Sequence, residues 1–141
     1  MTDQPPFDAD PSPDYSAAPP PPPPAYSGVV GEQPLSQSDE RLWAMLAHLS
    51  ELVFAIVAPL LIMVILGKRS AFVEDQAKEA LNFQITLLIA TFVAALSLFV
   101  LVGIVLLPLV IIGGVVFAIM AAIKSYGGEL YRYPLTIRFV K

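Results

Sequence analysis

The apolar run from Ile85 to Ile123 contains no charged side chain. As one straight helix it would extend about 58 Å, nearly twice the roughly 30 Å hydrocarbon core of a bilayer. The run therefore predicts two membrane-spanning helices. Gly103 and Pro108 are the strong helix breakers near its middle, so we expect a tight hairpin over 102–108 and spans of about 82–101 and 109–124.

A shorter apolar block, about residues 43–66, predicts a third span near the amino-terminal side. Its uninterrupted part, Leu52 to Leu66, would rise only about 22 Å as a helix, so the span must begin further back, near Trp43. Pro59 lies in the middle of this block, where proline removes a backbone hydrogen bond, and is expected to kink the helix. The apolar blocks thus predict an all-α membrane protein with three transmembrane helices.

The polar segments flanking these blocks have patterns of their own. In Gly67 to Leu81, apolar residues recur at three- and four-residue spacing, which predicts an amphipathic helix that begins after Ser70, lies at the interface and continues into the second span. The glycine pair Gly127-Gly128 is expected to end the third span. The segment Glu129 to Lys141 alternates aromatic and basic residues, typical of a strip with rings at headgroup depth and cations on phosphate.

Charge and proline content divide the chain near residue 39. Residues 1–40 hold seven acidic and no basic residues, whereas the rest of the chain holds all eight basic residues and five acidic ones. Eleven of the fourteen prolines lie between Pro5 and Pro34, so we expect 1–38 to be a disordered, proline-rich acidic tail and 39–141 to be the helical membrane domain. The run Pro19 to Pro24 has two interpretations, a ligand for a proline-recognising partner or a solvated spacer.

The same composition excludes several classes of protein. With 56% hydrophobic and 14% charged residues the chain is too apolar for a soluble domain, and its scattered cations exclude a nucleic-acid-binding surface. The absence of cysteine excludes disulfides, thiolate metal sites and a lipoprotein anchor. Three spans would place seven of the eight basic residues on the carboxyl-terminal side, so the positive-inside rule predicts a cell-membrane protein with an exported amino terminus and a cytoplasmic carboxyl terminus.

Polar side chains in or beside the apolar blocks are functional candidates, because an ionised group costs about 2.5–3.5 kcal/mol at the centre of a membrane helix. The candidates are His48, Glu51, Glu79, Asn82 and Gln84. His48 and Glu51 are three residues apart on one helical face, where one could bond or protonate the other. Either they belong to a proton or cation path with Glu79, or Glu51 reaches the headgroups while His48 bonds a neighbouring helix.

Other site chemistry finds little support in the sequence. One histidine without cysteine does not fill a metal site from a single segment, and no nucleophile stands in a catalytic arrangement, so we predict no enzyme, metal or cofactor. Small residues at successive fourth positions predict close helix packing, with Asn82 as a polar contact between helices. These packing positions are Ala90 and Ala94 on the second span and Gly114, Ala118 and Ala122 on the third.

Four ordered motifs within about residues 40–141 carry a family resemblance. They are Trp43 to Ser50, Pro59-Leu60, Lys78 to Gln84, and Ala121 to Lys124 followed by Gly128-Glu129 and Tyr131 to Leu135. The chain resembles the small bacterial membrane proteins of the domain of unknown function four-eight-seven-zero, grouped with the Tic-twenty component of chloroplast protein import. The resemblance implies a multi-pass helical protein without an established activity, in which His48 and Asn82 matter. The family often has a second histidine where this chain has Gln76, which weakens a two-histidine relay.

Two functions follow from these features. The first is a non-enzymatic scaffold or accessory subunit, whose helices pack on a membrane-protein partner or a second copy. The second is a component of a protein-translocation or ion-permeation pathway, which needs an oligomer because so few helices enclose no pore of their own. The sequence does not identify the partner or decide the role of the tail.

Overall fold

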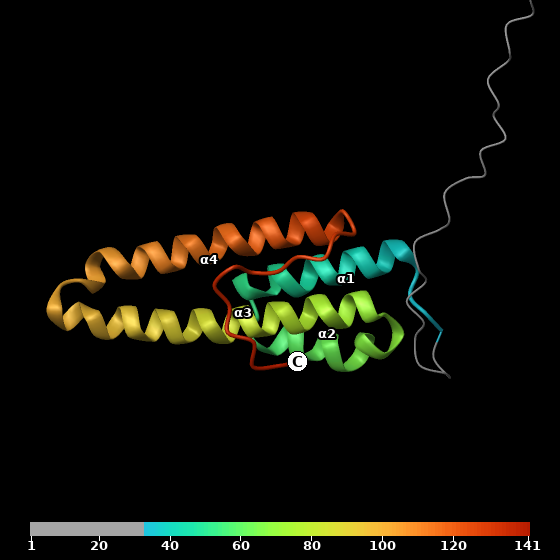
Figure 1. Ribbon diagram of the computed structural model, residues 1–141, viewed down its shortest axis with the longest axis horizontal. Helices are drawn as coiled ribbons and strands as arrows, with labels where there is room; N and C mark the ends of the chain where they lie inside the picture. The colour runs from blue at the N-terminus through green and yellow to red at the C-terminus, as the bar shows by residue number, and fades with distance from the viewer. Residues whose placement is uncertain (1–32) are drawn as a thin grey trace, which may run out of the picture.

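The computed structural model describes residues 33–141, and the predicted tail with Pro19 to Pro24 lies almost wholly outside the described residues. The described part is all-helical and contains no strand, which confirms the predicted fold class at that level (Figure 1). Its α-helices are α1 (Gln37–Leu49), α2 (Val57–Leu66), α3 (Ala71–Leu96) and α4 (Gly103–Tyr126). Short 3-10 turns follow the first three of them: η1 (Ser50–Leu52), η2 (Gly67–Arg69) and η3 (Ser97–Val100).

The long helices α3 and α4 form an antiparallel hairpin that projects well beyond α1 and α2 (Figure 1). Within residues 33–141, two helical stretches are long and apolar enough to cross a membrane, Ala71–Val100 and Gly103–Tyr126. The prediction of three spans is therefore wrong by one.

The predicted span over 43–66 is divided into two short antiparallel helices. At 13 and 10 residues, α1 and α2 extend about 20 and 15 Å, so neither crosses a bilayer. The chain reverses after η1, where Ala55 takes a left-handed φ of 43°. Pro59 does not kink a helix as predicted, because it is the third residue of α2, where a backbone N–H has no partner inside the helix.

The hairpin between α3 and α4 lies earlier in the chain than predicted. It comprises η3 and the two residues after it, with Leu101 at a left-handed φ of 65°, and α4 already begins at Gly103. Pro108 therefore lies inside α4 rather than in the turn. Gly103 sets the turn because its α-carbon packs onto the end of α3: a β-carbon there would lie 2.5 Å from the carbonyl oxygen of Ala94.

The amphipathic segment continues as one helix into the apolar part of α3, as predicted, and forms residues 71–81 of that helix. Its predicted start is confirmed, since the Ser70 hydroxyl accepts a hydrogen bond from the Val73 backbone N–H at 3.2 Å. The predicted end of the last helix is also confirmed: α4 ends at Tyr126, and Gly128 follows with a φ of 85°.

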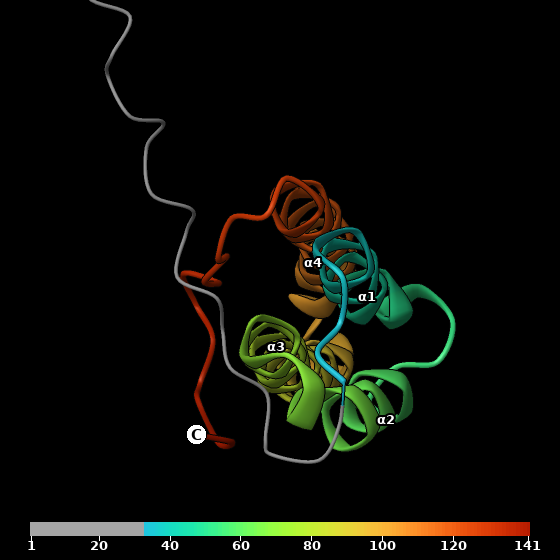
Figure 2. The same ribbon diagram turned by 90° about the vertical axis from the view of Figure 1, so that its right-hand side faces the viewer.

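The four helices form a bundle in which α1 lies beside α4 and α2 beside α3 (Figure 2). A buried apolar cluster joins α1, α2 and α3 and consists of Ala47, Ile62, Leu66, Val73, Ala77 and Ala80. Of the predicted packing positions, Ala94, Gly114, Ala118 and Ala122 are buried and Ala90 is half-buried.

The start of α1, the α2–α3 connection and the end of α4 all lie at one end of the bundle, hereafter the polar end (Figure 1). The Leu35 backbone N–H donates to the Arg69 carbonyl oxygen at 3.3 Å, and the Arg41 guanidinium lies against Gly128. The predicted placement of the two termini on opposite sides required three spans.

Candidate functional site

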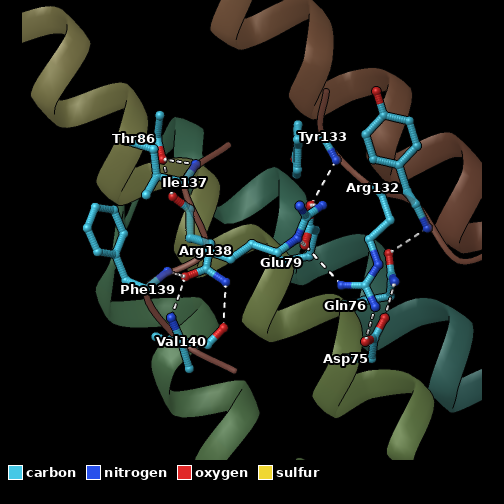
Figure 3. Close-up of polar contacts among 12 residues, drawn as sticks. Asp75, Gln76, Glu79, Thr86, Arg132, Tyr133, Ile137, Arg138, Phe139 and Val140 are labelled. Carbon is cyan, nitrogen blue, oxygen red and sulfur yellow. Dashed lines mark hydrogen bonds and ion pairs between the residues drawn. The ribbon is translucent and has the colours of Figure 1, made fainter. Parts of the chain in front are cut away.

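The residues after α4 run back along the bundle without regular secondary structure, with a turn at 134–135, and lie against one face of α3 (Figures 1 and 3). Polar side chains of α3 at three- and four-residue spacing bind the backbone of this C-terminal segment (residues 129–141). We call them the α3 ladder, and they are Gln76, Glu79, Asn82 and Thr86. The ladder attaches the last residues of the chain to the helix bundle.

Gln76 is the first member of the α3 ladder and is fully buried. Its Oε1 accepts hydrogen bonds from the Tyr131 backbone N–H at 3.2 Å and from the Ser125 hydroxyl at 3.0 Å. Its Nε2 donates to Asp75 Oδ2 at 3.0 Å. A backbone donor on one atom and a carboxylate on the other determine which way the amide points.

His48 on α1 is buried beside this amide. Its Nε2 lies 3.1 Å from Gln76 Oε1, which can only accept, so Nε2 carries the hydrogen. Its Nδ1 lies 3.0 Å from the Tyr133 hydroxyl and accepts from it. The ring is therefore the neutral Nε2–H tautomer.

Glu79 is the charged centre of the site and is 0% exposed. One carboxylate oxygen accepts from the Tyr133 backbone N–H at 2.9 Å and from Arg138 Nη2 at 3.2 Å. The other accepts from Arg132 Nη1 at 3.0 Å and from Arg138 Nε at 3.3 Å (Figure 3). Arg132 also pairs with Asp75 at 2.6 Å. Two guanidinium groups and one amide thus satisfy a carboxylate that has no access to solvent.

Asn82 and Thr86 hold the end of the C-terminal segment. Asn82 Nδ2 donates to the Val140 carbonyl oxygen at 2.8 Å, while its Oδ1 accepts from the N–H groups of Val140 at 2.7 Å and Phe139 at 2.9 Å. The Thr86 hydroxyl accepts from the Ile137 N–H at 3.1 Å. The Asn82 side chain therefore makes the hydrogen bonds that a neighbouring strand would make to this backbone. It does not make the predicted bond to another helix.

The two tyrosine rings of the C-terminal segment lie inside the bundle, whereas Phe139 is exposed. Tyr133 is 2% exposed and stacks on Phe83, with ring centroids 3.7 Å apart, and Tyr131 is also buried. The predicted headgroup-level strip is therefore wrong for Tyr131 and Tyr133, which pack inside the protein. Arg132 and Arg138 pair with the buried carboxylate of Glu79.

The predicted pairing of His48 with Glu51 does not occur, since Gln76 and Tyr133 occupy both ring nitrogens of His48. Glu51 lies beside α4, where a β-carbon on Gly114 would be 3.3 Å from Glu51 Oε1. Within residues 33–141, Glu51 Oε2 and both amide atoms of Gln84 are buried without a hydrogen-bond partner. In the same range, no hydrogen bond links His48, Glu51 and Glu79 into a proton path, and no three acidic or histidine side chains are placed to hold a metal ion.

Sequence reasoning missed most of the residues that complete the site. They are Gln76, Ser125, Tyr131, Arg132, Tyr133 and Arg138. Two patterns in the sequence could have revealed them together: polar residues on one face of the helix over 71–96, and alternating aromatic and basic residues after the last helix. A segment outside helices and strands leaves its backbone N–H groups without backbone partners. Where such a segment is buried, it needs side-chain acceptors such as those at three- and four-residue spacing on α3.

Comparison with known proteins places this architecture in a family. The sequence model of the family described as "Magnetosome magnetite crystal formation protein family" (MamF/MmsF) matches residues 39–140, which include most of the bundle and the C-terminal segment. No curated protein and no solved structure matches. The resemblance to the domain of unknown function four-eight-seven-zero and to Tic-twenty is therefore wrong; the motifs behind it are those that build the helix contacts and the α3 ladder. The chain belongs to the MamF/MmsF family.

Proposed function

We propose that this protein is a non-enzymatic accessory protein of a membrane, anchored by the α3–α4 hairpin, and that it takes part in magnetite crystal formation as its family's description says. The match over residues 39–140 carries this proposal. The geometry supports the non-enzymatic part, because the polar side chains of the α3 ladder are engaged in holding the C-terminal segment.

The polar end is the surface on which a partner would act. A polar cleft of about 370 Å³ opens there between α3 and the C-terminal segment. Charged side chains of both signs line it, among them Glu74, Asp75, Lys78, Arg132 and Lys141. We propose that a membrane-protein partner or a second copy of the chain binds at this surface. A separate, proline-recognising partner would bind residues 1–38. A pull-down in mild detergent with and without residues 1–38 would separate the two.

The two-span fold also changes the proposed orientation. The eight basic residues lie near the start of α1, in the α2–α3 connection and the first turns of α3, at the end of α4 and on the C-terminal segment, whereas the α3–α4 turn carries no charge. The positive-inside rule then favours a cytoplasmic polar end, with both ends of residues 33–141 in the cytoplasm. The exported amino terminus predicted from three spans is replaced by this arrangement.

Cysteine labelling tests this orientation, because the chain has no cysteine of its own. In intact cells, an impermeant maleimide is expected to react with Phe99→Cys at the α3–α4 turn and not with Ser38→Cys or Lys141→Cys. Permeabilised cells should label all three variants. Opposite accessibility of positions 38 and 141 would restore a three-span topology.

The function itself is tested in a magnetosome-forming host that lacks its own member of this family. Expression of this chain is expected to restore the size distribution of the magnetite crystals, measured by electron microscopy. The matched control is the same chain with Gly103→Ala, whose hairpin is damaged while its polar residues are intact. Unrestored crystals despite a membrane-inserted chain would contradict the proposal.

A further inference from the structure

The reversal between α1 and α2 lies at mid-depth of the α3–α4 hairpin. Glu51, in η1, touches the surface of α4 at Gly114, where a β-carbon would be 3.3 Å from Glu51 Oε1. Gly114 lies near the middle of the apolar stretch of α4, which extends from Gly103 to Ile123. At about 1.5 Å per residue it is ~17 and ~14 Å from the two ends of that stretch.

The surface of α2 and of the reversal is apolar, apart from Glu51, which lies beside α4. At the reversal, Val53, Phe54 and Val57 are 73%, 64% and 60% exposed. Every residue of α2 is apolar, and its outward side chains Leu61, Val64 and Ile65 are exposed as well. An exposed apolar surface of this extent is stable in lipid and not in water. The tip therefore belongs in the hydrocarbon core.

Beyond the reversal, only α3 and α4 continue (Figure 1). Their side chains there are exposed all round the pair, as at Leu88 and Phe92 on α3 and Ile104, Val105 and Ile112 on α4. The bundle thus has four helices in the half next to the polar end and two in the other half.

We propose that α1 and α2 form a re-entrant hairpin within one leaflet, so that the protein is a wedge whose wide half lies in the leaflet at the polar end. A helix with its side chains is about 10 Å across, so two additional helices take up area in that leaflet alone. Bilayers in which this leaflet is convex accommodate the extra area. The protein therefore prefers curved membrane with its polar end on the outer, convex side.

The depth of the tip is tested first, in the full chain. Two single-cysteine variants, Phe54→Cys and Phe99→Cys, are each labelled with an environment-sensitive fluorophore and reconstituted into liposomes. The liposomes contain lipids that carry a quenching nitroxide group at a chosen depth. A nitroxide near the bilayer midplane should quench the label at position 54 most, and a headgroup nitroxide the label at position 99. A label at position 54 that is quenched best by headgroup nitroxides overturns the wedge.

This inference rests on the membrane anchoring included in the proposed function, and the labels distinguish the two failures. Quenching of both positions by a water-soluble quencher alone would mean that the chain does not insert, which overturns both. Insertion at position 99 with a surface-exposed position 54 overturns the wedge only. Crystal restoration in the host remains a separate measurement.

The curvature preference is tested by orientation. Chains reconstituted into small sonicated vesicles and large extruded vesicles are labelled at Ser38→Cys with an impermeant maleimide. The ratio of outward to inward polar ends is expected to be about twofold higher in the small vesicles, since two helices of ~10 Å diameter widen one leaflet only. Equal ratios in the two preparations overturn the curvature preference.

A matched pair of variants assigns the effect to the re-entrant tip. Phe54→Asp places a charged side chain at mid-depth that is too short to reach the headgroups, so it should reduce the orientation bias. Phe99→Asp, at the outer end of the long hairpin, should leave the bias unchanged. Both side chains are exposed, at 64% and 89%, so neither change removes a packed core residue. Equal bias in the two variants contradicts the role of the tip.

Discussion

Replacement of both Arg132 and Arg138 by methionine is expected to lower the free energy of unfolding by about 3–5 kcal/mol. Glu79 has no solvent-exposed surface, and these two guanidinium groups are its cationic partners. Without them the carboxylate is a buried charge held only by the Tyr133 N–H. Methionine keeps much of the aliphatic volume, so the loss measures the charge and its hydrogen bonds.

A third substitution checks that explanation. Adding Glu79→Gln to the double variant removes the stranded charge while keeping an acceptor for the Tyr133 N–H, and should recover more than half of the lost stability. Denaturant or thermal unfolding in mild detergent measures all three chains. A further loss on adding Glu79→Gln would show that the charge was not the cause.

The exposed ion pair of Glu74 with Lys78 is the control for these measurements. Its atoms are 2.6 Å apart, yet the side chains are 41% and 28% exposed. Lys78→Met is expected to change the unfolding free energy by less than about 0.5 kcal/mol, as for other exposed helical pairs. The difference between the two losses of unfolding free energy then measures the effect of burial, because both experiments remove the cationic partners of a glutamate.

Gly103→Ala is expected to destabilise the α3–α4 hairpin by about 3 kcal/mol. A β-carbon at this position would lie 2.4 Å from the Leu98 backbone nitrogen and 2.5 Å from the Ala94 carbonyl oxygen. The first is a backbone atom of the turn and the second of the last turn of α3, and neither can move aside without unwinding the backbone there. Thermal unfolding and the yield of folded protein in detergent measure the loss.

Gly113→Ala, in the middle of α4, is the matched substitution. A β-carbon there meets no heavy atom within 4 Å, counted over the described residues. Alanine is about 1 kcal/mol better than glycine inside a helix, so this variant should be unchanged or slightly more stable. A loss at position 113 as large as that at 103 would contradict the packing explanation.

Local features of the fold were predictable where the cause was local. Ser70 caps α3 and the Gly127-Gly128 pair ends α4, because a hydroxyl acceptor and a left-handed glycine act within one turn of helix. The first apolar block shows the limit: its composition suits a span or two short helices equally well. Contacts of α1 and α2 with α3 decide between these forms, and no pattern within 43–66 contains them.

The residues of the site were also predictable only where the cause was local. The candidates His48, Glu79 and Asn82 were identified because a polar group next to an apolar helix is costly without a partner. Their partners were not, since Tyr133, Arg138 and Val140 lie far from them along the chain. The alternation after α4 predicted rings at headgroup depth and cations on phosphate, whereas Tyr131 and Tyr133 pack inside the protein and the arginines pair with Glu79.

By itself the sequence determined that this chain is helical, that the run from Ile85 to Ile123 needs two helices, and where α3 begins and α4 ends. These follow from hydrophobic length and from capping, which act over a few residues. Only the tertiary structure decided that α1 and α2 turn back at mid-depth and that the C-terminal segment lies on the α3 ladder. Both depend on contacts between distant segments, where a buried charge or backbone group takes the partner that packing brings closest.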